Sequence, residues 1–223
     1  MIRPISSLAQ SHHRDTTSVL TINHWPAIGL MAAGLATSPN SIKSSLQTDV
    51  QNFFGTSDSN LDDYLAFVPS AQTLIYALNK NNTDREYHVK AYAYSTAINL
   101  GITYAMKWTL DVQRPDGSAN NSFPSGHTSF AFSTATVSYM AFKDEKPILA
   151  WASYVPAAIT GVMRIQKNRH WVPDVLFGAG LGIITTQLTY RVLKSSPKYN
   201  AKKPLSNLHF DIGPGQLSLV YHL

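Results

Sequence analysis

One histidine in the chain is followed at helical spacing by a carboxylate. His170 precedes Asp174 by four residues, in the stretch RHWVPD that begins at Arg169. On a helix this spacing lets the carboxylate reach one ring nitrogen. A carboxylate that accepts the N–H of one ring nitrogen fixes the tautomer and leaves the other nitrogen as a nucleophile. The alternative is a histidine at a packing interface, followed by an aspartate that caps a helix.

A second histidine lies at a predicted helix start. His127 ends the stretch FPSGH that begins at Phe123, and an apolar helix is predicted from Thr128. The N–H groups of a first helical turn lack partners and carry the positive end of the helix dipole, so such an end binds anions. Ser125 adds a hydroxyl group, and Gly126 lets the backbone approach a ligand closely. An ordinary capped helix with a surface histidine is the competing interpretation.

Three cations accompany the histidines. Lys107 and Arg114 are seven residues apart, which predicts that both side chains lie on one face of a helix that ends at Pro115. Arg164 lies at the end of a later apolar segment. Neighbouring cations repel one another unless an anion lies between them, and arginine offers a planar fork for phosphate oxygens. A solvated basic face is the alternative. Taken with the two histidines, the cations suit phosphoryl transfer without a metal ion.

The order and spacing of these motifs resemble a known family. They are K-x6-R-P from Lys107, P-S-G-H ending at His127, and R-x5-H-x3-D from Arg164. This set is similar to that of the type 2 phosphatidic acid phosphatase and vanadium haloperoxidase superfamily, in its bacterial phosphatase branch. The resemblance implies an all-α six-helix bundle and a histidine-dependent phosphatase.

The resemblance also implies a role for each residue of the site. His170 would attack phosphorus with Asp174 orienting it, and His127 would protonate the leaving oxygen before the phosphohistidine is hydrolysed. The phosphate would be bound by Lys107, Arg114, Ser125, Gly126 and Arg164. The family usually has serine before the arginine of the third motif, whereas this chain has Met163, so one phosphate contact is absent or replaced. Neither a metal ion nor a cofactor is expected.

Six apolar segments are long enough to form the helices that position these motifs. They are Trp25–Thr37, Leu61–Leu78, Val89–Trp108, Thr128–Phe142, Pro147–Met163 and Val175–Leu193. The chain thus divides into a polar N-terminal arm (residues 1–22), a helical phosphatase domain (23–194) and a basic tail (195–223). In the tail, a Gly-Pro-Gly sequence separates two short apolar stretches, which predicts a β-hairpin.

Composition narrows the range of partners. The chain of 223 residues has no cysteine, which excludes cysteine-nucleophile phosphatases and thiolate metal sites. A net charge of +5 favours anionic partners. A nucleic-acid-binding protein is disfavoured, because the cations lie at the ends of apolar helices and not in a stripe with exposed aromatic residues. The expected partner is a phosphorylated lipid or a small phosphoester, and the sequence gives no oligomeric state.

The expected location is a bacterial membrane, with the active site facing the periplasm. Six apolar segments and a charged fraction of only 14%, against about 25% in typical soluble domains, favour it. The uncharged helix cores of about 12 to 17 residues are short for a bilayer, which takes about 20. The substrate would be a lipid phosphate such as phosphatidate, lipid A or a polyprenyl diphosphate. A soluble periplasmic non-specific acid phosphatase is the alternative, and a vanadate-dependent haloperoxidase is a more distant one, since those enzymes are larger.

Overall fold

The computed structural model describes residues 23–78, 82–195, 208–213 and 216–221. The predicted arm over residues 1–22 therefore lies outside the described residues, as does residue range 196–207 of the predicted tail. The described residues form these helices: α1 (Trp25–Ala36), α2 (Asn40–Phe54), α3 (Leu61–Leu65), α4 (Val68–Leu78), α5 (Asn82–Leu110), α6 (Gly126–Phe142), α7 (Pro147–Ala152), α8 (Tyr154–Gln166) and α9 (Val172–Ser195). The predicted helical bundle is confirmed.

Two of the predicted segments are each divided into two helices. The segment Leu61–Leu78 breaks after α3, and Pro147–Met163 breaks at Ser153, between α7 and α8. A proline follows each break, Pro69 in the first turn of α4 and Pro156 in that of α8. Because proline has no N–H, it cannot continue the hydrogen bonds of the preceding helix. The helix α2 was not predicted, since its sequence NSIKSSLQTDVQNFF is mostly polar.

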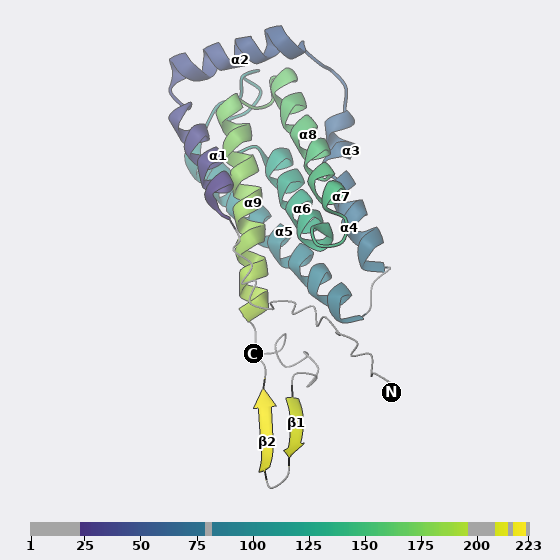
Figure 1. Ribbon diagram of the computed structural model, residues 1–223. Helices are drawn as coiled ribbons and strands as arrows, with labels where there is room; N and C mark the ends of the chain where they lie inside the picture. The colour runs from purple at the N-terminus through teal and green to yellow at the C-terminus, as the bar shows by residue number, and fades with distance from the viewer. Residues whose placement is uncertain (1–22, 79–81, 196–207, 214–215, 222–223) are drawn as a thin grey trace, which may run out of the picture.

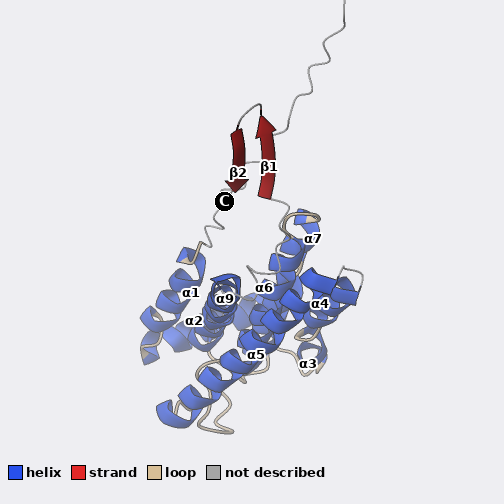
Figure 2. Cartoon of the chain, turned by 90° about the horizontal axis from the view of Figure 1, so that it is seen from below, coloured by secondary structure: helices blue, strands red, loops and turns tan. Residues whose placement is uncertain are grey.

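Helix α9 lies among α1, α5 and α6, and these four form the centre of the bundle (Figures 1 and 2). The backbones of α6 and α9 nearly touch. A Cβ atom added at Gly178 would lie 2.8 Å from the Ser125 carbonyl oxygen, and one at Gly182 would lie 2.3 Å from that of Ser129. Only glycine permits this approach, which fixes the first turn of α6 beside the first turns of α9.

Small and polar side chains fill much of the interior, while many large apolar ones face outward. The hydroxyl groups of Ser133 and Thr186 are 2.9 Å apart between α6 and α9, and both are buried. By contrast, Trp25 is 77% exposed, Ile148 86% and Val192 69%. Close approach of small residues, with few large apolar ones inside, is the packing mode of membrane helices. Within the described residues, the stretch Pro147–Gln166 is long and apolar enough to cross a membrane, by length and composition alone.

Helix α2 crosses one end of the bundle (Figure 1). There the side-chain amides of Gln47 and Gln51 donate to the Ile165 carbonyl oxygen, at 3.0 and 3.2 Å. The same amides donate to Asn168 Oδ1, at 3.0 and 2.7 Å. The helix α2 thus caps the C-terminal end of α8 and holds the loop that follows it.

The C-terminal strands pair as predicted. Strand β1 (Leu208–Gly213) lies antiparallel to β2 (Gln216–Tyr221), the two red arrows of Figure 2. Leu208 is opposite Tyr221, and Gly213 is opposite Gln216. The β-hairpin prediction is confirmed.

Candidate active site

Two loops that carry predicted site residues are joined to each other. One connects α5 to α6, and the other connects α8 to α9. Arg169 forms an ion pair with Asp116 at 3.2 Å, and the Asp116 N–H donates to the Asn168 carbonyl oxygen at 3.2 Å. The Trp171 indole N–H donates to the Gln113 carbonyl oxygen at 2.8 Å. These contacts bring motifs that are far apart in the sequence to one end of the bundle.

His170 and Asp174 are close, but the predicted helical pairing is wrong. His170 lies in the loop before α9, which begins only at Val172, while Asp174 is in the first turn. Pro173 has no N–H to give, so it suits the first turn of a helix and favours a start just after His170. The distance from His170 Nδ1 to Asp174 Oδ2 is 3.6 Å, longer than a hydrogen bond.

The Asp174 carboxylate has other partners. Its Oδ2 accepts hydrogen bonds from the Trp171 N–H at 2.9 Å and from the Ser122 hydroxyl at 2.5 Å. The carboxylate also lies at the N-terminal end of α9, where the helix dipole favours negative charge. Asp174 is therefore fixed in place independently of His170.

His170 is a buried, neutral imidazole. Its exposed fraction is 2%. Burial lowers the pKa of His170 to about 4, with Lys107 and Arg164 adding to the shift and Asp174 opposing it. At neutral pH the ring is uncharged and has a lone pair, as a nucleophile requires.

The predicted common helical face of Lys107 and Arg114 is wrong. Helix α5 ends at Leu110, because Asp111 adopts a φ of 47°, in the left-handed region that terminates helices. Arg114 lies in the following loop, where its backbone N–H donates to the Ala119 carbonyl oxygen at 2.9 Å. Sequence spacing could not reveal a helix end that depends on one backbone torsion.

Lys107, in the last turn of α5, reaches the loop before α6. Its Nζ donates to the Ser122 carbonyl oxygen at 3.4 Å and also to that of Asn121. The Ser122 hydroxyl donates to the Asp174 carboxylate. Ser122 therefore links Lys107 to Asp174. The lysine of the first motif and the aspartate of the third are thus brought together.

The two motif arginines have buried N–H groups for which the described residues offer no acceptor. In the described part of the chain, Nε of Arg114 and Nε of Arg164 have no hydrogen-bond partner. Burial lowers the pKa of Arg114, and repulsion from the charge of Arg164 lowers it further. A buried donor without a partner costs about 1–3 kcal/mol. An anion between the arginines would remove that cost for both.

The first turn of α6 carries the second motif as predicted. Helix α6 begins at Gly126, with Ser125 as its N-cap residue. The Ser125 N–H donates to the Asp174 carbonyl oxygen at 3.0 Å, and the Ser125 hydroxyl is 2.8 Å from that of Thr128. A Cβ added at Gly126 would meet protein atoms no nearer than 3.7 Å, so packing within the chain does not require glycine there.

Sequence reasoning missed two site residues, Asp62 and Asp63 of α3. Asp62 is fully buried between Arg164, at 2.6 Å, and Lys167, at 3.0 Å. Burial would raise the pKa of Asp62, but hydrogen bonds from both cations outweigh it and the pKa is lowered. Asp63 Oδ1 lies 3.0 Å from His127 Nε2. The only signal in the sequence was a pair of adjacent carboxylates inside an otherwise apolar segment.

Met163, where the family usually has serine, is 7% exposed and lies directly before Arg164 in α8. A thioether cannot donate a hydrogen bond to phosphate. The phosphate contact expected of a serine at this position is therefore absent from this side chain.

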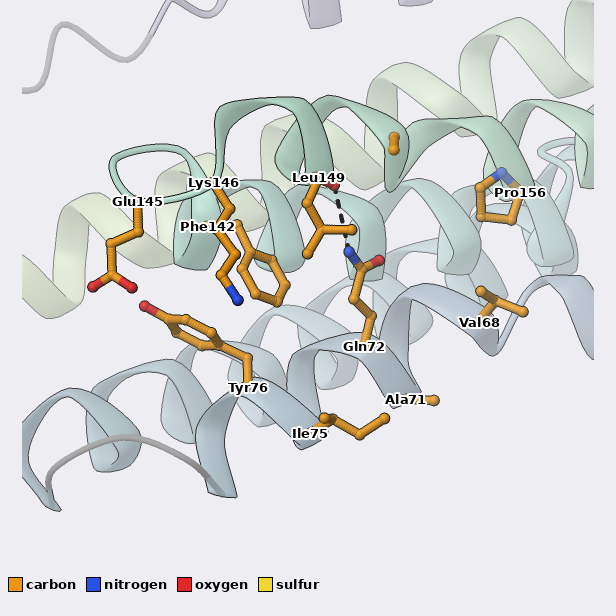
Figure 3. A pocket seen from close by; sticks show the side chains of 11 residues that line it. Val68, Ala71, Gln72, Ile75, Tyr76, Phe142, Glu145, Lys146, Leu149 and Pro156 are labelled. Atoms are coloured by element: carbon orange, nitrogen blue, oxygen red, sulfur yellow. Dashed lines mark hydrogen bonds between the residues drawn. The ribbon is translucent and has the colours of Figure 1, made fainter.

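A groove of about 890 Å³ lies along α4 and α7, away from the residues described above (Figure 3). Gln72 donates across it to the Leu149 carbonyl oxygen at 3.4 Å. Its lining is mostly apolar, with Tyr76, Glu145 and Lys146 near one end. None of the predicted site residues lines this groove, so it is distinct from the cluster of cations and histidines.

The chain matches a known protein family over the region that holds the three motifs. The model of the PAP2 superfamily matches residues 88–198, about half of the sequence. The chain belongs to the PAP2 superfamily. The matched range holds all three motifs, from Lys107 to Asp174, so the resemblance inferred from them is confirmed.

Proteins from several bacteria are similar to this PAP2 protein. A lipid A 1-phosphatase of Porphyromonas gingivalis is 43% identical over 98 residues, which are 44% of this chain and 22% of that protein. The chain therefore spans about a fifth of that relative's length. The crystal structure of Aquifex aeolicus LpxE matches with a TM-score of 0.51 and 22% identity, over 66% of this chain and 93% of that one. This likeness supports the helical fold.

A second solved structure has weaker similarity. It is a transmembrane PAP2 type phosphatidylglycerolphosphate phosphatase from Bacillus subtilis, with a TM-score of 0.47 and 18% identity, over 80% of this chain and 98% of that one.

Proposed function

We propose that this PAP2 protein hydrolyses a phosphate ester or diphosphate of a lipid through a phosphohistidine intermediate. One observation carries the proposal. Nε of Arg114 and Nε of Arg164 are buried, and no atom of the described residues accepts a hydrogen bond from them. Buried polar atoms in proteins are normally paired. A phosphate group would accept the N–H groups of both arginines beside a neutral histidine.

Each step of the reaction has a group to perform it. Because Nδ1 of His170 faces Asp174, the other ring nitrogen, Nε2, attacks phosphorus. As the N–P bond forms, the bond from phosphorus to the ester oxygen breaks, and His127 gives that oxygen a proton. Water then attacks the phosphohistidine while His127 takes a proton from it, releasing inorganic phosphate and free His170.

The cations stabilise the transferred group. Phosphoryl transfer depends mainly on positioning and on stabilising charge at the phosphate oxygens. Lys107, Arg114 and Arg164 supply that charge, and the N-terminal end of α6 with Ser125 adds hydrogen-bond donors. Every candidate substrate presents the same phosphate group. These residues therefore determine which reaction takes place, but they do not select the leaving group.

A lipid substrate and a membrane location form the finer part of the proposal. Large apolar side chains cover the outer face of α5, where Ile98 is 47% exposed and Trp108 82%. Contiguous exposed apolar surface marks contact with a membrane or a partner. The motif residues lie at helix ends, where a lipid head group would arrive from the bilayer surface. The name of the Porphyromonas gingivalis relative favours lipid A among the lipid phosphates, and the periplasmic side is the expected face.

Phosphate release from a panel of substrates tests this function. Detergent-solubilised protein would be assayed with lipid A, phosphatidate, a polyprenyl diphosphate and glycerol phosphate, beside the variants His170→Ala and, as a control, His24→Gln. We expect release from a lipid, a loss of about 10⁴-fold or more in His170→Ala, and full activity in His24→Gln. Turnover retained by purified His170→Ala protein contradicts the mechanism. Activity on glycerol phosphate alone, with the protein in the supernatant after high-speed centrifugation of a lysate without detergent, favours the soluble acid phosphatase alternative.

The covalent intermediate has its own test. The variant His127→Ala, given a ³²P-labelled nitrophenyl phosphate, should form the phosphoenzyme but hydrolyse it slowly. We expect label on the protein that is stable to alkali and lost in acid, as a phosphohistidine is, and no label on the double variant with His170→Ala. Label that persists in the double variant assigns the nucleophile to another residue.

A further inference from the structure

Helix α3 places two adjacent carboxylates at the site, and they have different partners. Asp62 is fully buried and is bound by Arg164 at 2.6 Å and by Lys167 at 3.0 Å, so its charge is matched. Asp63 is 49% exposed, and its Oδ1 lies 3.0 Å from Nε2 of His127. Asp62 therefore anchors α3 to α8, and this anchor delivers Asp63 to the histidine.

Burial lowers the pKa of His127 and so favours the neutral ring, and the charges that face it act in opposite directions. Among the described residues they are Asp62 and Asp63 from α3 and Arg164 from α8. The cation Arg164 opposes a positive charge on the ring, but Asp62 largely neutralises that cation. Asp63 is within hydrogen-bonding distance of His127 and 3.9 Å from Arg164. Asp63 is thus the carboxylate placed to stabilise a protonated His127.

We infer that Asp63 is a positioning residue that holds His127 as a correctly oriented acid. Asp63 accepts the Nε2–H of the imidazolium ring, which leaves Nδ1–H as the proton donor. This inference rests on the proposed phosphatase function. When the ester bond breaks, its electron pair remains on the leaving oxygen, which takes the Nδ1 proton. His127 becomes neutral while Nε2–H stays bonded to Asp63, so Nδ1 is ready to accept a proton from water in the second step.

The role predicts an effect that depends on the leaving group. An alkoxide leaves poorly without a proton, whereas a nitrophenolate leaves without one. In Asp63→Asn, the single-turnover rate of alkyl ester cleavage should fall about 10–100-fold, within the range for general acid catalysis. Nitrophenyl ester cleavage should change by less than about threefold, since it does not need the acid. The alkaline limb of the alkyl ester pH profile should move to lower pH, because the amide no longer stabilises the imidazolium.

The matched control is Asp58→Asn, an exposed carboxylate shortly before α3. It should cleave both esters at the unmodified rate with an unchanged pH profile. Asp63→Glu, which keeps the charge, should recover part of the alkyl ester activity, and the thermal melting temperature of each variant shows whether it is folded.

Two results would overturn the role of Asp63. An equal loss for both esters, with no movement of the alkaline limb, would show a merely structural contribution, and rates equal to those of Asp58→Asn would show none. His170→Ala separates these outcomes from failure of the proposed function. If His170→Ala is inactive while Asp63→Asn matches its control, only the role of Asp63 is wrong; if His170→Ala is active, the phosphohistidine mechanism itself is wrong.

Discussion

The Nδ1 atom of His170 and the Oδ2 atom of Asp174 are 3.6 Å apart, just beyond hydrogen-bonding distance. The carboxylate is held by the Ser122 hydroxyl and the Trp171 N–H, so only the imidazole would have to move for the two to bond. Catalytic hydrogen bonds are often long before the substrate binds and shorten in the reactive complex. We therefore expect this pair to close when the phosphate draws the ring toward it.

Replacing Asp174 by asparagine tests that expectation. An amide has the shape of the carboxylate but cannot stabilise the positive charge that His170 acquires on attack. The loss in kcat should be about 10²–10⁴-fold, as for an orienting aspartate in a catalytic triad, with little change in KM. Ser122→Ala leaves the Trp171 N–H in place and should cost about 10- to 100-fold at most, as expected for one hydrogen bond to a charged group. Steady-state kinetics of both variants would be compared, and near-normal kcat in Asp174→Asn would exclude the pair from catalysis.

The acid limb of the pH profile should report His170. Its pKa is lowered to about 4, chiefly by burial. The protonated ring cannot attack, so kcat/KM should fall as the pH drops through about 4, not through the ordinary value of about 6.5. Between this acid limb and the alkaline limb set by His127, kcat/KM should be level. A phosphate monoester substrate has its own second ionisation near pH 6. The measured kcat/KM values must be corrected for this ionisation of the substrate. A residual acid limb near pH 6.5 would contradict a buried, neutral His170.

The contact between α6 and α9 should not tolerate a methyl group. A Cβ at Gly182 would lie 2.3 Å from the backbone oxygen of Ser129, so Gly182→Ala must push the helices apart. We expect the free energy of unfolding to fall by about 1–3 kcal/mol, the usual cost of overpacking. Activity should also fall, because the motif at the start of α6 would move away from the motif at the start of α9. The control is Gly101→Ala in α5, where an added Cβ meets nothing within 4 Å. Thermal unfolding in detergent compares the two, and equal melting temperatures would refute the tight contact.

Activity should not depend on a divalent metal ion. The proposed phosphate site neutralises charge with Lys107, Arg114 and Arg164, which perform the task that Mg²⁺ performs in other phosphoryl transfer enzymes. Turnover should therefore persist in EDTA, and vanadate should inhibit competitively as a trigonal-bipyramidal analogue. Arg114→Lys, which loses the planar fork, should weaken vanadate inhibition about tenfold or more. Loss of turnover in EDTA with recovery on adding Mg²⁺ would show that the cations have been assigned the wrong role.

The sequence was sufficient for the chemistry of the motifs and for most helices. The spacing of Lys107, His127 and His170 with their neighbours identified the family, because each motif is local and its residue types are set by phosphate chemistry. Long apolar segments predicted helices in the right places, since apolar length is a local property. The prolines at positions 69 and 156 were visible in the sequence too, but a proline within an apolar segment gives only a probable helix boundary.

The tertiary structure alone decided how these pieces meet. Asp62 and Arg164 are 102 residues apart in the chain and 2.6 Å apart in space, a pairing that no spacing rule can predict. The end of α5 at Leu110 depends on the torsion of Asp111, and the start of α9 leaves His170 in a loop, so periodicity gave the wrong local geometry for both motifs. Local sequence determines which groups are present. The relative placement of helices, fixed by contacts such as that of Gly182 with Ser129, determines which of them touch.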